Sequence, residues 1–170
     1  MYLHSKGTGA EMEFHVDIEA VPGDLLILSI SKKAVPNRVM SYWRLTKVDR
    51  LPPLEIGIDC EEACIADITI FLESSSFLRL ESPDVKIING SLLVDTSVFN
   101  KAYDFIDINK GYTVSIAGNK LVCLFQVCDA IKQGYQTDRL EVYLNSNRDI
   151  IGFAICDLTA EELNVIHSIS

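Results

Sequence analysis

The chain has 170 residues with a net charge of −9, and 48% of its residues are hydrophobic. This hydrophobic content excludes a disordered chain, and the length predicts a single domain, residues 1–170, with a substantial core. The negative charge argues against direct binding of nucleic acid, which needs a field that attracts phosphates; it suits a basic protein partner, or solubility alone.

Polar and apolar residues alternate from residue 11 to residue 21, and this period of two predicts a strand with one apolar face. Pro22-Gly23-Asp24 predicts a turn into a second strand over 25–31, and a third strand is predicted over 39–48. The polar face of the first strand carries four carboxylates and one imidazole, on Glu11, Glu13, His15, Asp17 and Glu19.

Two β-rich stretches then have similar sequence patterns. Residues 54–70 turn through Cys60-Glu61-Glu62-Ala63, and residues 140–155 turn through the polar run 145–149. Each stretch is typical of an antiparallel hairpin. An internal duplication would explain the shared pattern, and so would the chance similarity of short alternating strands.

The middle of the chain supplies further hairpin signals. Asn89-Gly90 between two apolar runs predicts a tight hairpin over 85–94, because both central residues of a type I′ turn need positive φ. Residues 98–108 fit a short helix or a loop. A second hairpin is predicted over 112–127, and the polar stretch 129–138 is predicted to be a loop.

A short helix is predicted at the C-terminal end. Thr159 and Glu162 have the spacing of a capping box, in which each side chain bonds to the free amide of the other residue. The fold class that follows is mainly β (α+β), with antiparallel hairpins forming a sandwich or a half-barrel and a helix at the C-terminal end.

Five cysteines are expected to be reduced, because the N-terminus shows no secretory signal. Cys60 and Cys64, like Cys123 and Cys128, lack a nearby histidine or third cysteine at zinc-site spacing, so no metal or cofactor is predicted. Cys123 and Cys156 lie in apolar strands and are expected in the core. No apolar run approaches the roughly 20 residues that span a bilayer, so we expect a cytoplasmic protein with no membrane contact.

No catalytic constellation is predicted. A nucleophilic serine or cysteine needs a histidine base that a third group orients, and only His4, His15 and His167 are available. His167 suits the C-terminal turn of the helix, and His15 lies among carboxylates on a strand face, so both positions suit structural or partner-facing roles.

Several runs of the sequence resemble a known family. These are NRVMSYWRL (37–45), PLEIGID (53–59), IADITIF (65–71) and IGFAICDLTAEE (151–162). They are similar to small bacterial immunity proteins, which neutralise the nuclease toxins of contact-dependent growth inhibition and related polymorphic toxin systems. The resemblance implies a β-rich cytoplasmic inhibitor that binds the C-terminal nuclease domain of its cognate toxin. It also implies that β-augmentation can contribute, because in some members the toxin adds a hairpin to the inhibitor's sheet.

Family binding residues vary between toxin pairs, so the candidate surface comes from charge placement. It consists of Glu55, Asp59, Glu61, Glu62 and Asp67, with Glu11, Glu13, Asp17 and Glu19 as a second patch. Tyr42 and Tyr143 are added because aromatic side chains are frequent at interface hot spots. Since Tyr42 and Trp43 are adjacent in one strand, they must face opposite sides, and one of them belongs to the core.

Two other functions fit the same sequence. A small-molecule binding module would hold a ligand in the mouth of a β-barrel. An enzyme acting on a sugar would need two carboxylates facing each other across a cleft.

Overall fold

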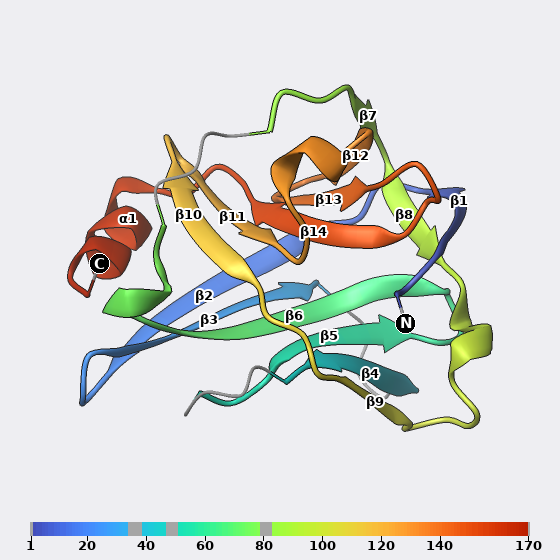
Figure 1. Cartoon of the computed structure of the whole chain (residues 1–170), viewed down its shortest axis with the longest axis horizontal. Helices are drawn as coiled ribbons and strands as arrows, with labels where there is room; N and C mark the ends of the chain where they lie inside the picture. The colour runs from blue at the N-terminus through green and yellow to red at the C-terminus, as the bar shows by residue number, and fades with distance from the viewer. Residues whose placement is uncertain (1, 34–38, 47–50, 79–82, 170) are drawn as a thin grey trace.

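Two sheets, packed face to face, form the body of the protein (Figure 1). The structure is a computed structural model that describes residues 2–33, 39–46, 51–78 and 83–169. The large sheet contains β1 (Ser5–Gly9), β2 (Phe14–Val21), β3 (Leu25–Lys32), β4 (Met40–Leu45), β5 (Leu54–Asp59), β6 (Cys64–Glu73), β8 (Ser91–Val94) and β9 (Phe105–Ile108). The small sheet contains β7 (Ile87–Asn89), β10 (Thr113–Ala117), β11 (Lys120–Leu124), β12 (Gln133–Thr137), β13 (Leu140–Leu144) and β14 (Ile150–Ile155).

The large sheet is curled because its longest strand, β6, has two partners along one edge. β6 pairs with β8 at Cys64 and with β3 from Asp67 onward, while β5 pairs along its other edge. The predicted fold class is therefore confirmed: the protein is mainly β, with a curled half-barrel sheet and one α-helix at its C-terminal end within the described chain.

Each sheet contains the same arrangement of consecutive strands. β2 to β6 lie in the order β2-β3-β6-β5-β4, and β10 to β14 lie in the order β10-β11-β14-β13-β12. A parallel strand completes each arrangement, β9 beside β4 and β7 beside β12. The two hairpins with similar sequence patterns are β5–β6 and β13–β14, so they occupy equivalent places, as an internal duplication predicts.

The inner faces of both sheets share one core. Alternate residues of each strand point inward, so that Leu28, Ile56 and Ile68 of the large sheet join Val142 and Phe153 of the small sheet in a single apolar cluster. The aromatic ring of Trp43 lies 5.7 Å from that of Phe125, whose centroid lies 6.1 Å from that of Phe153. Burial of this apolar surface is the main force that holds the sheets together.

Helix α1 (Ala160–His167) begins at the predicted capping box. The Glu162 amide donates to Oγ1 of Thr159 at 3.2 Å, and the Thr159 amide donates to Oε2 of Glu162 at 2.8 Å. At eight residues, α1 is far too short to cross a bilayer, and the described part of the chain holds no other helix that could.

Two local predictions are wrong. Asn89-Gly90 forms no hairpin, because the chain passes there from β7 in the small sheet to β8 in the large one. Gly90 is still required, since its φ is 129° and the Cγ2 atom of Thr8 lies 2.8 Å from the place that a Cβ atom would take. The predicted loop 129–138 contains β12, whose polar residues are paired with β13 on one side and β7 on the other.

Other predictions agree with the structure within the described residues. Cys123 and Cys156 are buried, and Trp43 is a core residue while Tyr42 is half-buried on the opposite side. The prediction of a short helix or a loop over 98–108 is wrong at its end, where Phe105–Ile108 form strand β9. The end of the third predicted strand, residues 47 and 48, lies outside the described residues.

Candidate partner-binding face

The outer face of the large sheet carries five of the eleven side chains that the sequence indicated: Asp17, Glu19, Tyr42, Glu55 and Asp67. Strand pairing places its side chains in two rows that run across the strands β9, β4, β5, β6, β3 and β2. The first row is Phe105, Tyr42, Gly57, Asp67, Ser31 and His15. The second row is Asp107, Arg44, Glu55, Thr69, Ser29 and Asp17. We call these two rows, together with Glu19 on β2, the acidic face.

An aromatic stack stands at one end of the acidic face. The rings of Tyr42 and Phe105 lie 5.4 Å apart with an angle of 12° between their planes, and Phe105 is 54% exposed. The Arg44 guanidinium lies 4.7 Å from the centroid of the Phe105 ring, which is a cation–π contact. Exposed aromatic side chains held in place by neighbours are typical anchors at protein interfaces.

The same guanidinium forms a bidentate pair. Arg44 Nε and Nη2 donate to the two carboxylate oxygens of Asp107 at 2.6 and 2.9 Å, and Nη1 lies 3.7 Å from Oε1 of Glu55. The hydrogen bond to Asp107 raises the pKa of Arg44. The positive charge of Arg44 is therefore already engaged, whereas Asp67 on β6 has no ion pair with a described residue.

Asp67 is half-buried between Glu55 and Tyr42. Burial and the negative charge of Glu55 raise its pKa to about 6, and a backbone hydrogen bond from Gly57 opposes the shift. Its carboxylate oxygens lie 2.6 Å from the position of a Cβ atom at Gly57, so any larger residue there would displace the carboxylate. Burial, Asp67 and Glu55 together raise the pKa of Tyr42. A carboxylate held in this way disfavours its own charge and favours a cation beside it.

The predicted site residues do not all lie on this face. Tyr42, Glu55 and Asp67 are neighbours on it, and Asp17 and Glu19 lie on it beyond strand β3. Glu13 lies at the end of the face in an ion pair with Lys33 at 3.3 Å, and Glu11 is exposed before β2 begins.

The remaining predicted residues lie elsewhere. Glu61 and Glu62 are exposed in the turn after β5, and Asp59 is only 2% exposed because its Oδ1 accepts the amides of both turn residues at 3.0 Å. Tyr143 is 1% exposed on the small sheet, and its hydroxyl donates to Oε2 of Glu141 at 2.7 Å. Burial and this bond raise the pKa of Tyr143. Asp59 and Tyr143 are thus removed from the accessible surface, so neither can serve as a contact in this conformation.

The sequence reasoning missed Arg44, Phe105 and Asp107. Phe105 to Ile108 alternates with a period of two, and this signal could have identified β9 as a strand. Its pairing with β4 could not have been predicted, because the two strands are parallel and distant in sequence.

Asp59, Glu62 and Cys64 bring possible metal-ligand atoms within 4.8 Å of one another. The Lys32 ammonium group bonds to Glu62 and lies 4.0 Å from Sγ of Cys64. A protein cation therefore already neutralises this cluster, which makes it a poor site for a metal ion.

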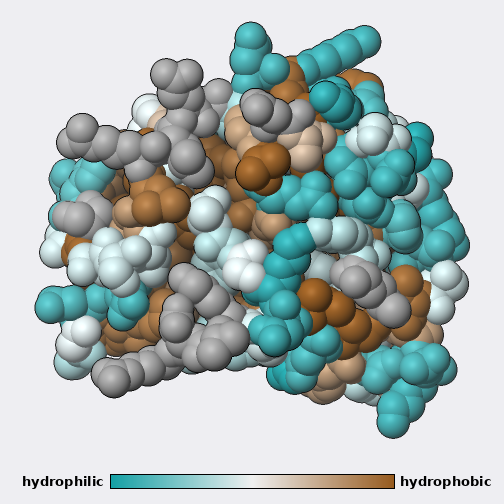
Figure 2. Space-filling view, viewed as in Figure 1, coloured by the Kyte–Doolittle hydropathy of each residue, from teal (hydrophilic) through white to brown (hydrophobic). Residues whose placement is uncertain are grey.

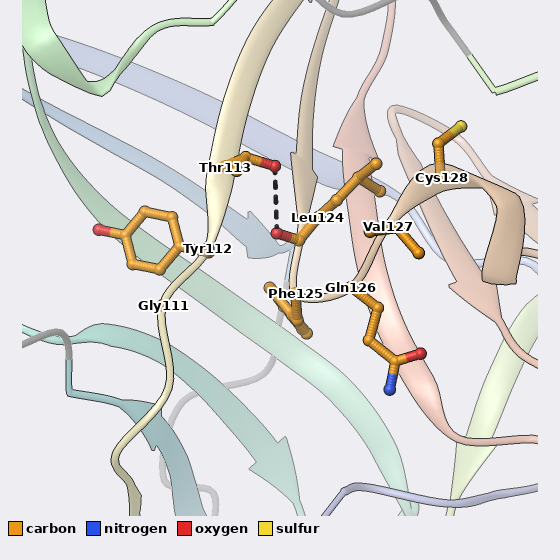
Figure 3. Close-up of a pocket in the computed structure, with 8 residues that line it drawn as sticks. All are labelled: Gly111, Tyr112, Thr113, Leu124, Phe125, Gln126, Val127 and Cys128. Carbon is orange, nitrogen blue, oxygen red and sulfur yellow. Dashed lines mark hydrogen bonds between the residues drawn. The ribbon is translucent and has the colours of Figure 1, made fainter.

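A separate apolar groove of about 570 Å³ opens between the start of β10 and the segment after β11 (Figure 3). Its lining is Gly111, Tyr112, Thr113, Leu124, Phe125, Gln126, Val127 and Cys128. Burial raises the pKa of Tyr112 to about 12, and Val127 is 75% exposed. Figure 2 shows apolar atoms exposed among hydrophilic ones on this side of the molecule. The lining is mostly apolar and carries no carboxylate or imidazole, so the groove is suited to bind an apolar group.

No protein-family model matches the chain, and no curated protein has a similar sequence.

Proposed function

We propose that this protein is a cytoplasmic immunity protein that binds the nuclease domain of a cognate toxin and blocks the basic surface on which that domain binds nucleic acid. The protein contributes no chemistry of its own. The observation that carries the proposal is the acidic face, where Glu55 and Asp67 lie near the aromatic stack of Tyr42 and Phe105, and Asp17 and Glu19 lie beyond β3 on the edge strand β2.

The chemistry of the expected partner fits this face. A nuclease domain needs positive charge to bind phosphates, so an acidic surface is complementary to it. Complementary charge accelerates encounter, and the aromatic stack of Tyr42 and Phe105 supplies the apolar contact that stabilises a docked complex. The net charge of −9 extends the same attraction over the whole molecule.

The edge of β2 supports a contribution from β-augmentation. The Glu13 carbonyl accepts the Lys33 amide at 2.8 Å, so odd-numbered residues of this strand bond toward β3. The backbone groups of Val16, Ile18 and Ala20 therefore point away from β3, toward the edge of the sheet. A partner strand could pair there, next to the carboxylates of the acidic face.

The test is capture of the cognate toxin's nuclease domain by the full chain, followed by assay of nuclease activity. The double variant Glu55→Lys, Asp67→Lys should lose capture and inhibition. The matched control is Glu61→Lys, Glu62→Lys, which makes the same charge change in the turn after β5, away from the face. Equal binding by wild type and the face variant would overturn the proposal.

The apolar groove favours a second candidate function, binding of a small apolar molecule. Its volume of about 570 Å³ lies in the range of small-ligand sites. A thermal-shift screen of apolar metabolites tests this function, and Val127→Asp should abolish any shift that a bound ligand produces.

A further inference from the structure

A group of hydrogen-bond donors borders the apolar groove. Gln126, one of the lining residues, donates its side-chain amide to the hydroxyl oxygen of Tyr2 at 2.6 Å. The ammonium group of Lys110 donates to the same oxygen and lies 4.2 Å from the centroid of the Tyr2 ring. Lys110 directly precedes Gly111, which also lines the groove. Figure 3 shows the Gln126 amide directed away from Thr113, so the donors lie toward one side of the groove.

No anion neutralises these donors among the described residues. The Tyr2 hydroxyl accepts two hydrogen bonds and keeps its own hydrogen for donation, and Lys110 forms no ion pair. Burial lowers the pKa of Lys110, and the negative charge of Asp149 opposes that shift. The Asp149 oxygens already lie 2.8 Å from Nδ1 of His4 and 2.9 Å from Nδ2 of Asn145. A half-buried ammonium group without a counterion favours an anion beside it.

We infer that the apolar groove binds an amphiphilic carboxylic acid, with the apolar body on the groove lining and the carboxylate at the donors of Lys110, Tyr2 and Gln126. The inference rests on the second candidate function, small-molecule binding, and names the chemical class of the ligand. Leu124 and Phe125 supply apolar contact for the body of the molecule. A carboxylate accepts hydrogen bonds from an ammonium, a hydroxyl and an amide group, and the bond from the ammonium group is charge-assisted.

The charge of the surroundings favours a head group with one negative charge. The site holds one ammonium group, and Asp149 lies close enough to act on it, so a doubly charged head group would be repelled. The net charge of −9 also repels anions from the molecule as a whole. A preference for a carboxylate over a neutral molecule of the same length must therefore come from local donors, which makes this preference the quantity to measure.

The experiment uses the full chain and two probes with the same alkyl chain, octanoate and 1-octanol. Trp43 is the only tryptophan, and its ring lies 5.7 Å from that of Phe125 in the groove lining, so its fluorescence should report binding. Octanoate should bind about fivefold more tightly than octanol, as one half-exposed charge pair predicts. Lys110→Gln should abolish this preference and leave the affinity for octanol unchanged. The control Lys33→Gln removes the same charge outside the groove lining and should behave like wild type.

The outcomes separate the carboxylate site from the second candidate function. If octanoate and octanol bind equally and both are lost in Val127→Asp, the groove binds small molecules and the carboxylate site fails. A preference for octanoate that persists in Lys110→Gln would also overturn the carboxylate site. If neither probe changes the fluorescence of Trp43 or the NMR amide signals of Gly111 and Val127, both the site and the second candidate function fail. Capture of the toxin domain tests the immunity function separately, because Lys110 lies outside the acidic face.

Discussion

The outer faces of the two sheets differ although the sheets share a strand arrangement. On the small sheet this face is apolar and buried: Val122, Leu124, Tyr143, Ile151 and Ala154 form a second core, against which Tyr2, Val85 and Ile87 pack. On the large sheet the corresponding face is polar and accessible. The protein's own chain thus covers one sheet on both sides, while the other sheet keeps a face that a partner can cover.

Each sheet also has a glycine whose side-chain position is taken by a neighbouring residue, and the two neighbouring residues differ in the same way. Gly134 on β12 pairs with Tyr143, and the Cδ1 atom of Ile87 lies 2.5 Å from the position of a Cβ atom at Gly134. In the large sheet Gly57 pairs with Tyr42, and the space above it contains the carboxylate of Asp67. An apolar side chain, that of Ile87, lies over Gly134. A carboxylate, that of Asp67, lies over Gly57, and its negative charge favours a cation beside it.

The largest expected effect contrasts two isoleucines. Ile151→Ala should lower the free energy of unfolding by about 3 kcal/mol, because it leaves a cavity under the covering segment of the small sheet. Ile27→Ala makes the same change at a half-buried position on the outer side of the large sheet and should cost about 1 kcal/mol. Urea unfolding of both variants measures the difference. Equal losses would mean that the two outer faces are equally buried.

The next contrast concerns two tyrosine hydroxyls. Tyr143→Phe should cost about 1.5 kcal/mol, because the buried Glu141 carboxylate loses a hydrogen bond and keeps its contact with Lys120. Tyr42→Phe should change the stability by less than about 0.5 kcal/mol, because the ring stack with Phe105 is retained. Thermal denaturation at neutral pH checks both values, and a large loss in Tyr42→Phe would contradict the description of its site.

The smallest expected effect is a gain. The pKa of Asp67 is about 6 in the folded protein, above its value in an unfolded chain, so the folded state holds this proton more tightly. The contribution of Asp67 to stability therefore falls as the pH rises from about 4 to about 6, and that loss persists at higher pH. Asp67→Asn should be more stable than wild type by about 1 kcal/mol at pH 7.5, with the gain vanishing near pH 4.

Other titratable and charged groups lie near Asp67, so a control variant is needed to assign the pH dependence to Asp67. They are Glu55 on β5, Tyr42 and Arg44 on β4, and His15 beyond Ser31 in the same row. Asp107→Asn is the matched control, and it should destabilise the protein slightly because it breaks the pair with Arg44. A gain in stability at pH 7.5 in the control as well would assign the effect to net charge rather than to the site of Asp67.

Much of the large sheet could be predicted from the sequence, because strands with one polar face alternate visibly. Such alternation identified β2 and the opposite orientations of Tyr42 and Trp43, and the turn at Pro22-Gly23-Asp24 identified β3. The small sheet is buried on both sides, so Ile150–Ile155 reads as a continuous apolar run that does not reveal which face has a cover. For this reason the burial of Tyr143 could not be predicted.

Long-range pairing limited the prediction of the site. Glu55 and Asp67 follow from one hairpin, but their place on the same face as Asp17 depends on β3 pairing with both β2 and β6. The parallel strands β7 and β9 give no local turn signal, so Phe105 and Asp107 were missed. The burial of Asp59 could not be predicted, because an acidic residue before a turn can cap that turn as readily as it can face solvent.

The most direct test of the acidic face as the partner surface is the affinity of the cognate nuclease domain at several salt concentrations. Wild type is compared with Glu55→Gln, Asp67→Asn and with the control Glu11→Gln, Glu61→Gln, which removes the same charge away from the two rows. The face variant should bind about tenfold more weakly with a smaller salt dependence, and the control should bind like wild type. Equal loss in both double variants would show that net charge alone drives binding. Unchanged affinity in the face variant would show that the partner does not bind the acidic face.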